Sequence, residues 1–352
     1  MFVAIRDLRF AKGRFALMGA VVTLITLLVV LLSGLTAGLG RGNTSAITDI
    51  SADHLVFAAP ASGASLSFSD SILSPQVQGE WAKVPGVDRA EPISIAMSRA
   101  SAGDRSAGVA VFAVNPGSAL APDVRAGSVV LSTKAAVALG VSGGDQVDLA
   151  GKSVMVASVA GSDEFSHAPL LWASMADRPA TGQAAGVASV IALQTSDADL
   201  AAADQQLGTT TVTPDNSLAA IGSYTSENGS LQLMRMLLFA ISALVIGAFF
   251  TVWTVQRSGE IAILKAVGAS TGYLLKDALG QALVLLLIGT TTGTALAAGI
   301  GALAGSTVPF VLSLGTLLFP AAVMIALGLA GAAISLRRVT TIDPLTALGS
   351  AR

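Results

Sequence analysis

Long apolar stretches without a charged side chain stand out along this chain, and they predict helices that cross a membrane. They cover residues 15–40, 236–256 and 278–336. Because a bilayer core of about 30 Å takes roughly 20 helical residues, the first two stretches suit one span each and the third suits two. Turn-forming residues in 305–309, followed by Gly315 and Pro320, are expected to separate those two spans. Four spans are therefore predicted.

These stretches divide the chain into a membrane part and one large inserted segment. We predict, in order, an elbow helix, a span, an α+β domain, a second span, a coupling loop, a third span, an external turn, a fourth span and a tail. Their predicted limits are 1–14, 15–40, 41–230, 231–256, 257–277, 278–303, 304–313, 314–336 and 337–352. The first stretch exceeds the roughly 7–15 residues of a signal-peptide core, so an uncleaved anchor is expected. The predicted fold class is a membrane protein with one transmembrane α-helix before the inserted α+β domain and three after it.

The inserted segment has the pattern of a mixed domain, because short runs of Val, Ile, Leu and Phe are separated by Gly, Pro, Asp and Ser. Strands are predicted at 53–59, 108–114, 128–132, 146–149, 153–160 and 189–193, and helices at 76–83, 133–139 and 197–207. A segment of about 190 residues exceeds a typical single domain, so two packed lobes are expected. The polar, Gly- and Ser-rich stretch 213–230 is predicted to link the domain to the second span.

Charge indicates which side of the membrane each part faces. Basic residues cluster in 1–14, in 257–277 and in the tail, whereas residues 41–235 carry 18 acidic and 10 basic side chains. Lys and Arg are retained on the cytoplasmic side, so both termini are predicted to be cytoplasmic and the inserted domain extracellular, in a bacterial cell membrane. Composition agrees with a membrane protein: only 12% of residues are charged and the mean hydropathy is +0.72, against about 25% charged residues in soluble domains.

Several kinds of chemistry are disfavoured by what the sequence lacks. It has no cysteine, and no Gly-x-x-x-x-Gly-Lys-Ser/Thr loop that would cradle ATP. The two histidines, His54 and His167, are interpreted as solvated loop residues, and neither a catalytic site nor a metal site in the chain itself is predicted. The last two predicted spans carry no ionisable side chain, which disfavours an ion-coupled carrier. The absence of a clustered basic stripe disfavours nucleic-acid binding.

Small residues in the predicted spans indicate close contacts between helices. Gly34 and Gly38 lie four apart in the first span. The third span carries an edge of small residues at the same spacing, formed by Gly289, Gly293, Ala297, Gly301 and Gly305. Such spacing lets helix backbones approach, which is a main route to helix association in lipid. A helix–helix seam is predicted, either within one subunit or between two.

The charged loop between the second and third spans has the pattern of a short amphipathic helix with a capped start, one apolar face and a glycine stop. The residues that form this pattern are Ser258, Glu260, Ile261, Leu264, Val267 and Gly268. Ser270 or Thr271 then suits the cap of a second helix over residues 273–277. Such a helix at a membrane face needs a partner against which to pack.

Two stretches resemble motifs of the MacB/FtsX-type ABC permease family. The family's loop motif, R-x-x-E-I-x-x-L-K-A-x-G-A, is matched by Arg257, Glu260, Ile261, Leu264, Lys265, Gly268 and Ala269. Residues 342–348 resemble its C-terminal signature I-D-P-x-x-A-L, and residues 141–147 resemble a turn of its external domains. The resemblance follows the whole chain in order. It implies the permease subunit of an ABC efflux pump, without enzyme activity of its own.

The resemblance also implies partners. They are a second copy of this chain in a homodimer, the membrane lipid, and two separate ABC ATPase subunits that bind ATP and Mg²⁺; no nucleic acid is expected. Closure of the ATPase dimer would push on the loop helix and tilt the spans, a mechanism called mechanotransmission. The candidate coupling residues are Arg257, Glu260, Ile261, Leu264, Lys265 and Gly268.

Within that family, the compact plan with one modest external domain and no fused ATPase most resembles the HrtB-like haem exporters. The segment at the start of the second span suits an amphipathic metalloporphyrin, carried as substrate and not as a covalent cofactor. Tyr224 and Glu227 offer oxygen ligands, Met234 and Met236 offer thioethers, and Arg235 offers a partner for a propionate. Methionines also fill gaps between helices, and that interpretation stays open for each of them.

Other functions remain open at this stage. An FtsX-like scaffold would relay ATPase strokes to an extracellular partner without transport, and a membrane-anchored sensor would bind a ligand with its external domain. Drugs, peptides and lipids are alternative cargo for an exporter. An adjacent ATPase gene would favour the exporter and the scaffold over the sensor. Loss of resistance to a toxic small molecule on deletion would favour export.

Overall fold

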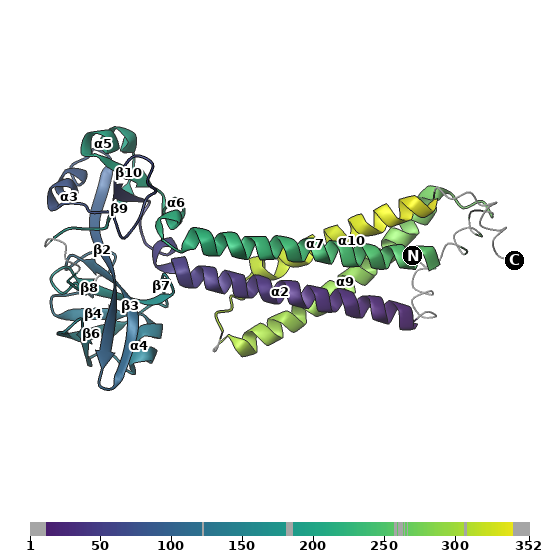
Figure 1. Cartoon of the computed structure of the whole chain (residues 1–352), viewed down its shortest axis with the longest axis horizontal. Coiled ribbons are helices and arrows are strands. Elements are labelled where there is room, and N and C mark those ends of the chain that lie inside the picture. Colours follow the sequence, from purple (N-terminus) through teal and green to yellow (C-terminus); the bar gives the residue numbers. More distant parts are fainter. Residues whose placement is uncertain are drawn as a thin grey trace. The chain divides into compact units, whose positions relative to one another are not determined.

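The computed structural model describes residues 12–121, 123–180, 186–256, 259, 263, 265, 267–305 and 308–340. The chain divides into two compact units: an inserted domain, residues 39–229, and a membrane unit formed by the residues before and after it. Two long helices, α2 (Lys12–Thr48) and α7 (Tyr224–Gln256), run through the chain positions at which the units divide. Figure 1 shows the strands gathered in the inserted domain and the long helices in the membrane unit.

Within the described residues, four helices are long and apolar enough to cross a membrane. Besides α2 and α7 they are α9 (Thr271–Ala304) and α10 (Leu314–Thr340). The predicted fold class, one such helix before an inserted α+β domain and three after it, is confirmed. Both α2 and α7 are longer than the predicted spans 15–40 and 231–256, because their helical hydrogen bonds continue into the polar residues of the inserted domain.

Two predicted connections turn out to be helical. α9 starts at Thr271, with Ser270 as its cap, whose hydroxyl accepts a hydrogen bond from the Tyr273 amide at 3.2 Å. Residues 273–277 therefore open the third span and do not form a separate helix. The predicted linker 213–230 holds α6 (Pro214–Ser217), the 3-10 helix η1 (Leu218–Ala220) and the first turns of α7. Thr213, a polar residue that suggested a loop, caps α6 through the Asn216 amide at 3.3 Å.

Gly315 and Pro320, which were also read as turn-forming residues, lie inside α10, as the predicted limits of the fourth span, 314–336, require. A proline removes one backbone hydrogen bond and is tolerated in membrane helices where neighbouring groups compensate. Here Pro320 stands near the start of the helix, and side-chain contacts of Thr316 close its first turn: the Thr316 hydroxyl accepts from the Ser313 amide at 3.0 Å and donates to the Val311 carbonyl oxygen at 2.9 Å.

Side chains from all four long helices meet in one apolar core of the membrane unit. It includes Val22, Val29, Phe250, Trp253, Leu286 and Met324. Helices α7 and α10 come close at two glycines, since a Cβ built on Gly331 would lie 3.0 Å from the Cα of Gly247. One turn further along, the hydroxyls of Thr251 and Ser335 are 2.7 Å apart. Small residues and paired hydroxyls are the usual means of joining helices in lipid.

The inserted domain is organised around one long strand, β2 (Val87–Ala102). Its first half pairs with β9 (Val190–Thr195), and β1 (His54–Ala58) and β10 (Thr209–Val212) follow in the sheet. Its second half pairs with β3 (Arg105–Val114) and with β5 (Gln146–Leu149). From β3 the order continues through β8 (Ala168–Ser174), β4 (Ser128–Leu131) and β6 (Lys152–Val159) to β5, so the sheet closes into a barrel.

Two lobes result, joined by β2 (Figure 1). In one lobe, α3 (Pro75–Trp81) and α5 (Leu200–Leu207) pack on β1 and β9, with Trp81 fully buried. In the other, α4 (Thr133–Leu139) packs against the barrel core. The strands and helices predicted in this domain are present. Strands β2, β7 (Glu164–Phe165), β8 and β10 were not predicted. In β2, charged residues and Pro92 interrupt the alternation, and its pairing with β9 in one half and with β3 and β5 in the other is a tertiary feature.

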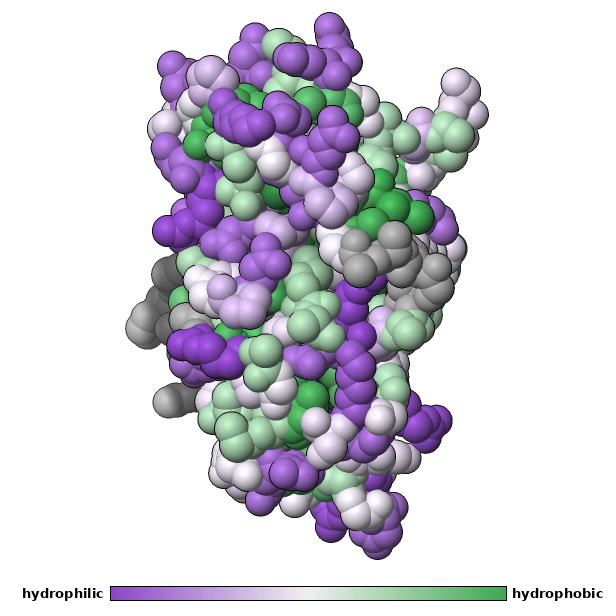
Figure 2. Space-filling view, turned by 90° about the vertical axis from the view of Figure 1, so that its left-hand side faces the viewer, coloured by the Kyte–Doolittle hydropathy of each residue, from purple (hydrophilic) through white to green (hydrophobic). Residues whose placement is uncertain are grey.

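The surface of the inserted domain suits contact with water. The face shown in Figure 2 is largely hydrophilic, with apolar patches of limited size between the polar side chains. Exposed large apolar residues of this domain include Ile72, Met97 and Val137. Single apolar residues at a protein surface are normal and need no partner.

Candidate functional site

One short β-hairpin lies where the chain enters and leaves the inserted domain. Its strands, β7 (Glu164–Phe165) and β8, pair through Phe165 and Ala168, which leaves Ser166 and His167 as a two-residue turn. Both turn residues have positive φ, 51° and 63°. Turns of this kind normally use Asn, Asp or Gly, because a Cβ is unfavourable in the left-handed region. Such backbone strain persists where neighbouring contacts hold it in place.

The end of α2 supplies those contacts. The Ser166 and His167 amides donate to the carbonyl oxygens of Asn43 and Gly42, each at 2.9 Å. Gly42 leaves room for this approach, since a Cβ built on it would lie 3.3 Å from Glu164 Oε2 and 3.5 Å from His167 Nδ1. The hairpin tip is therefore bound to α2 through backbone groups.

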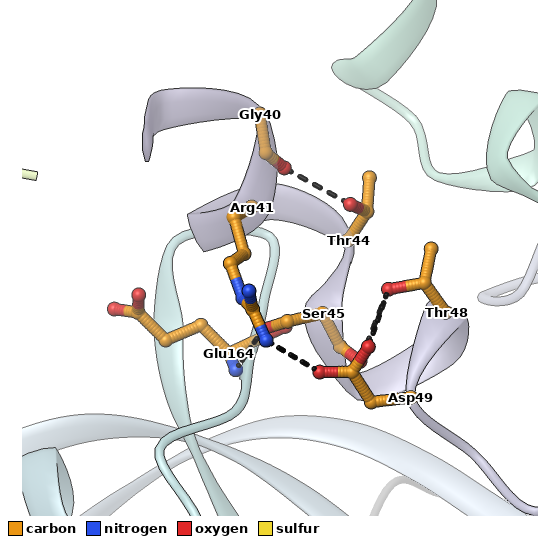
Figure 3. Close-up of polar contacts among 7 residues, drawn as sticks. All are labelled: Gly40, Arg41, Thr44, Ser45, Thr48, Asp49 and Glu164. Atoms are coloured by element: carbon orange, nitrogen blue, oxygen red, sulfur yellow. Dashed lines mark hydrogen bonds and ion pairs between the residues drawn. The ribbon is translucent and has the colours of Figure 1, made fainter. Parts of the chain in front are cut away.

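Polar side chains strengthen the same attachment, as Figure 3 shows. The Ser45 hydroxyl accepts from the Glu164 amide at 2.8 Å and donates to the Glu164 carbonyl oxygen at 3.3 Å. Arg41 of α2 pairs at 3.0 Å with Asp49, the residue that follows the helix. The Glu164 carboxylate forms an ion pair with Lys134 of α4. The end of α2, the hairpin and α4 are thus held together by bonds that use both backbone and side chains.

Glu227 of α7 joins this arrangement. Its Oε2 accepts a hydrogen bond from Asn43 Nδ2 at 2.8 Å and lies 2.8 Å from His167 Nε2. Three segments that are distant in sequence therefore meet at one carboxylate oxygen; we call Asn43, His167 and Glu227 the junction cluster. The side chains of Glu227 and His167 are each 41% exposed, so a ligand can reach them from solvent.

Asp163 lies next to the hairpin in a different electrostatic setting. Burial raises the pKa of Asp163, and the nearby carboxylate of Asp49 raises it further, whereas Arg41 lowers it. An aspartate whose pKa is raised in the folded state contributes stability while it is protonated, and that contribution is lost as the pH rises through the folded-state pKa. The charged form of Asp163 therefore destabilises the inserted domain at neutral pH.

Replacing Asp163 by asparagine is expected to raise the Tm at pH 7, because the uncharged amide is neither repelled by Asp49 nor penalised as a buried charge. The difference in Tm between the variant and the parent should vanish at about pH 3, below the ordinary pKa range of aspartate, because the parent carboxyl is then uncharged as well. Thermal unfolding of the purified chain across this pH range measures the difference. The exposed turn residue Asp104, changed to asparagine, is the control; a Tm for D163N no higher than the parent's at pH 7 would contradict the prediction.

The other residues predicted to bind substrate lie along the start of α7. Tyr224 packs against the apolar core of the inserted domain. The Arg235 guanidinium donates to Gln232 Oε1 at 2.6 Å, within the same helix. Met234 and Met236 are 48% and 61% exposed. Met234 follows Glu227 by two helical turns, so they share one face of the helix, whereas Met236 lies on another face.

Two members of the junction cluster were missed by sequence reasoning. Asn43, just after the predicted span 15–40, was not among the predicted site residues, and His167 was interpreted as a solvated loop residue. Asn43 and Glu227 are 184 positions apart along the chain, and no local pattern connects residues at such a distance. The two-residue turn at Ser166 and His167 could have indicated the hairpin, but Ser-His is not a sequence that such turns normally use. Among the described residues, no three His, Asp or Glu side chains lie together as a metal site would require.

The glycines predicted to pack helices have two kinds of neighbour. A Cβ built on Gly289 would lie 2.7 Å from Val22, and one on Gly293 would lie 2.6 Å from the Thr23 carbonyl oxygen. The seam between α2 and α9 is therefore within one chain. Three further glycines differ from expectation, because the nearest atoms to their built Cβ positions belong to Pro309 and Phe310 of the α9–α10 connection. These glycines are Gly34, Gly38 and Gly301.

Most of the predicted coupling residues, namely Arg257, Glu260, Ile261 and Leu264, lie outside the described residues, as do residues 1–11 of the predicted elbow helix and the motif 342–348. Gly268 is described: its φ is 101° and its amide donates to the Lys265 carbonyl oxygen at 3.1 Å. A left-handed glycine of this kind is a common end of a helical turn. The coupling role of these residues remains a prediction.

Comparison with known proteins relates this architecture to one class of transporter. Residues 233–344 match the family described as FtsX-like permease C-terminal. The whole chain is similar to the putative hemin transport system permease protein HrtB of Staphylococcus epidermidis, at 26% identity over 99% of both chains. It is also similar to an uncharacterized ABC transporter permease of Mycobacterium tuberculosis, at 25% identity over 99% of both chains.

Among solved structures, the extracellular domain of YknZ, a noncanonic ABC-type transporter from Gram-positive bacteria, is similar over 46% of this chain and 99% of its own length. The identity is 13% and the TM-score 0.36. Residues 233–344 thus match an FtsX-like permease C-terminal domain, and the chain as a whole, with its four candidate membrane helices, is similar to ABC transporter permeases.

Proposed function

We propose that this permease exports haem, or a closely similar amphipathic metalloporphyrin, with energy from a separate ATPase subunit. The end-to-end similarity to relatives whose names give hemin transport supports this cargo. Within this chain, the observation that carries the proposal is the junction cluster, in which a partly exposed carboxylate is held between an imidazole and an amide.

The chemistry of the cluster suits haem. Protein oxygen and imidazole groups ligate haem iron, and propionates bind charged and amide N–H donors. Oε2 of Glu227 already contacts Asn43 and His167. A bound porphyrin would place its iron on Glu227 or His167, whereas a propionate would accept a hydrogen bond from Asn43 Nδ2 or from His167. When the iron takes the Glu227 carboxylate, Asn43 or His167 is released from that carboxylate and can donate a hydrogen bond to a propionate.

In the proposed pump, the inserted domain is extracellular, both termini are cytoplasmic and two copies of the chain work together. The loop 257–277 receives the stroke of the ATPase, and Arg257, Glu260, Ile261, Leu264, Lys265 and Gly268 are the candidate contacts. Continuous helices support such a relay, since α2 and α7 each run without interruption from the membrane unit into the inserted domain. A helix with intact hydrogen bonds transmits displacement along its axis.

Haemin titration of the purified complex with its ATPase in lipid nanodiscs tests the cargo. We expect a saturable shift of the Soret band together with faster ATP hydrolysis. Metal-free protoporphyrin IX is the matched control, because it has the same ring and propionates but no iron to ligate. Absence of a saturable shift and of stimulation would exclude haem as cargo. Stimulation by an extracellular protein alone would then favour an FtsX-like scaffold, and stimulation by drugs, peptides or lipids would favour another export substrate.

A further inference from the structure

The connection between α9 and α10 is bound in a cradle made by glycines of α2 and α9. Cβ atoms built on Gly34 and Gly301 would each lie 2.3 Å from the ring of Phe310, at its Cζ and Cε1 atoms respectively. No side chain fits at such a distance, because carbon atoms in contact are about 3.5–4.0 Å apart. The phenyl ring therefore occupies space that any residue other than glycine would need.

Backbone contacts hold the same segment on either side of the ring. A Cβ built on Gly38 would lie 1.9 Å from the Pro309 carbonyl oxygen. The Val311 amide donates a hydrogen bond to the Gly34 carbonyl oxygen at 3.1 Å. Residues 309–311, which we call the strap, are thus fixed to α2 by main-chain atoms as well as by the Phe310 side chain.

The ring lies where α2 and α9 diverge. At Gly293 the two helices are in direct contact, since a Cβ built there would lie 2.8 Å from the Cβ of Thr26. Eight positions further along both helices, Gly301 and Gly34 face each other across the ring of Phe310. Facing residues advance by the same number of positions along α2 and α9, so the two helices run parallel. The ring of Phe310 fills the gap that opens between them.

We propose that the strap sets the separation of α2 and α9, so that the two helices move as one body while Phe310 is seated. The rigid ring of Phe310 would resist closure of the gap between α2 and α9. The main-chain hydrogen bond from Val311 to Gly34 would resist its opening. Because α2 continues to Thr48, motion of α9 and α10 would pass into the helix that leads to the inserted domain. This device does not depend on which cargo the permease carries.

A double-mutant cycle tests the wedge. Gly34→Ala and Gly301→Ala should each lower the Tm of the purified chain by about 5 °C, as expected for overpacking in a chain of this size. Phe310→Ala should restore most of that loss in either background, because it vacates the space that the new methyl group needs. It should not rescue Gly38→Ala, whose methyl group meets the Pro309 backbone. Gly299→Ala and Phe319→Ala, at exposed positions, are the controls.

The cycle remains decisive even if a single variant does not fold. Recovery of folded protein in G34A/F310A or G301A/F310A, from singles that cannot be purified, supports the wedge. Unchanged Tm in both glycine variants, or no relief by F310A, overturns it.

Spin labels supply an independent measurement, because the chain has no cysteine of its own. Labels at Leu28 of α2 and Leu303 of α9, both exposed, should give one narrow distance distribution in the parent. F310A should broaden or shift that distribution, whereas Phe319→Ala should not. An unchanged distribution in F310A would show that the strap does not set the separation of the helices.

Discussion

Gly293→Leu is expected to leave little folded protein after extraction from the membrane. A Cβ at this position would already lie 2.6 Å from the Thr23 carbonyl oxygen and 3.1 Å from the Leu27 amide nitrogen. These are backbone atoms of α2, so no side-chain rotation relieves the clash, and the rest of the leucine needs further space. Overpacking costs about 1–3 kcal/mol even when side chains adjust. A loss beyond that range is a large share of the roughly 5–15 kcal/mol that stabilises a typical protein.

The measurement is the yield of monodisperse protein in mild detergent and its Tm. Gly299→Leu in the same helix is the matched control, because Gly299 is exposed and a Cβ there meets no atom within 4 Å. We expect near-parental yield for the control and a severe loss for Gly293→Leu. Parental yield and Tm for both variants would show that α2 and α9 do not pack as described.

Glu227→Ala is expected to weaken haemin binding at least tenfold, which corresponds to about 1.4 kcal/mol. The substitution removes the carboxylate that the junction cluster holds and leaves Asn43 and His167 without their shared acceptor. The partly exposed contact with His167 contributes little to stability, but the buried Asn43 amide loses its acceptor, which costs about 1–3 kcal/mol. A loss of affinity larger than that of Asn43→Ala, which breaks the same buried hydrogen bond, would therefore separate a binding role from a structural one.

The Soret titration in nanodiscs measures this affinity, with His167→Ala and Asn43→Ala beside Glu227→Ala. His167→Ala should also weaken haemin binding. Asn43→Ala should weaken it less, because an asparagine amide does not normally ligate haem iron. Glu80→Ala, which breaks the exposed ion pair with Lys83 at 2.9 Å, is the control for loss of a surface carboxylate. Unchanged affinity in both Glu227→Ala and His167→Ala would exclude the junction cluster as the haem site and leave the permease assignment intact.

The fold class could be predicted from residue patterns because membrane insertion is decided locally. A stretch of about 20 uncharged apolar residues buries itself in lipid whatever the rest of the chain does. The four long helices were predictable for this reason, whereas strands β2, β7, β8 and β10 of the inserted domain were not predicted. Helix limits were less so, since α2 and α7 continue into polar residues, although α10 starts at the predicted Leu314. Hydropathy marks where a helix meets lipid and not where it ends.

What the sequence by itself determined is the division into a membrane unit and an inserted domain, and the family motifs of the loop 257–277 and the tail. Only the tertiary structure decided which partners the marked residues have. Glycine spacing predicted close packing, but the structure assigned Gly289 and Gly293 to a helix seam and Gly34, Gly38 and Gly301 to a loop. Glu227 stood out as a ligand, but its contacts with Asn43 and His167 needed the fold. The physical reason is that a side chain's type sets what it can bind, whereas chain topology sets what lies within reach.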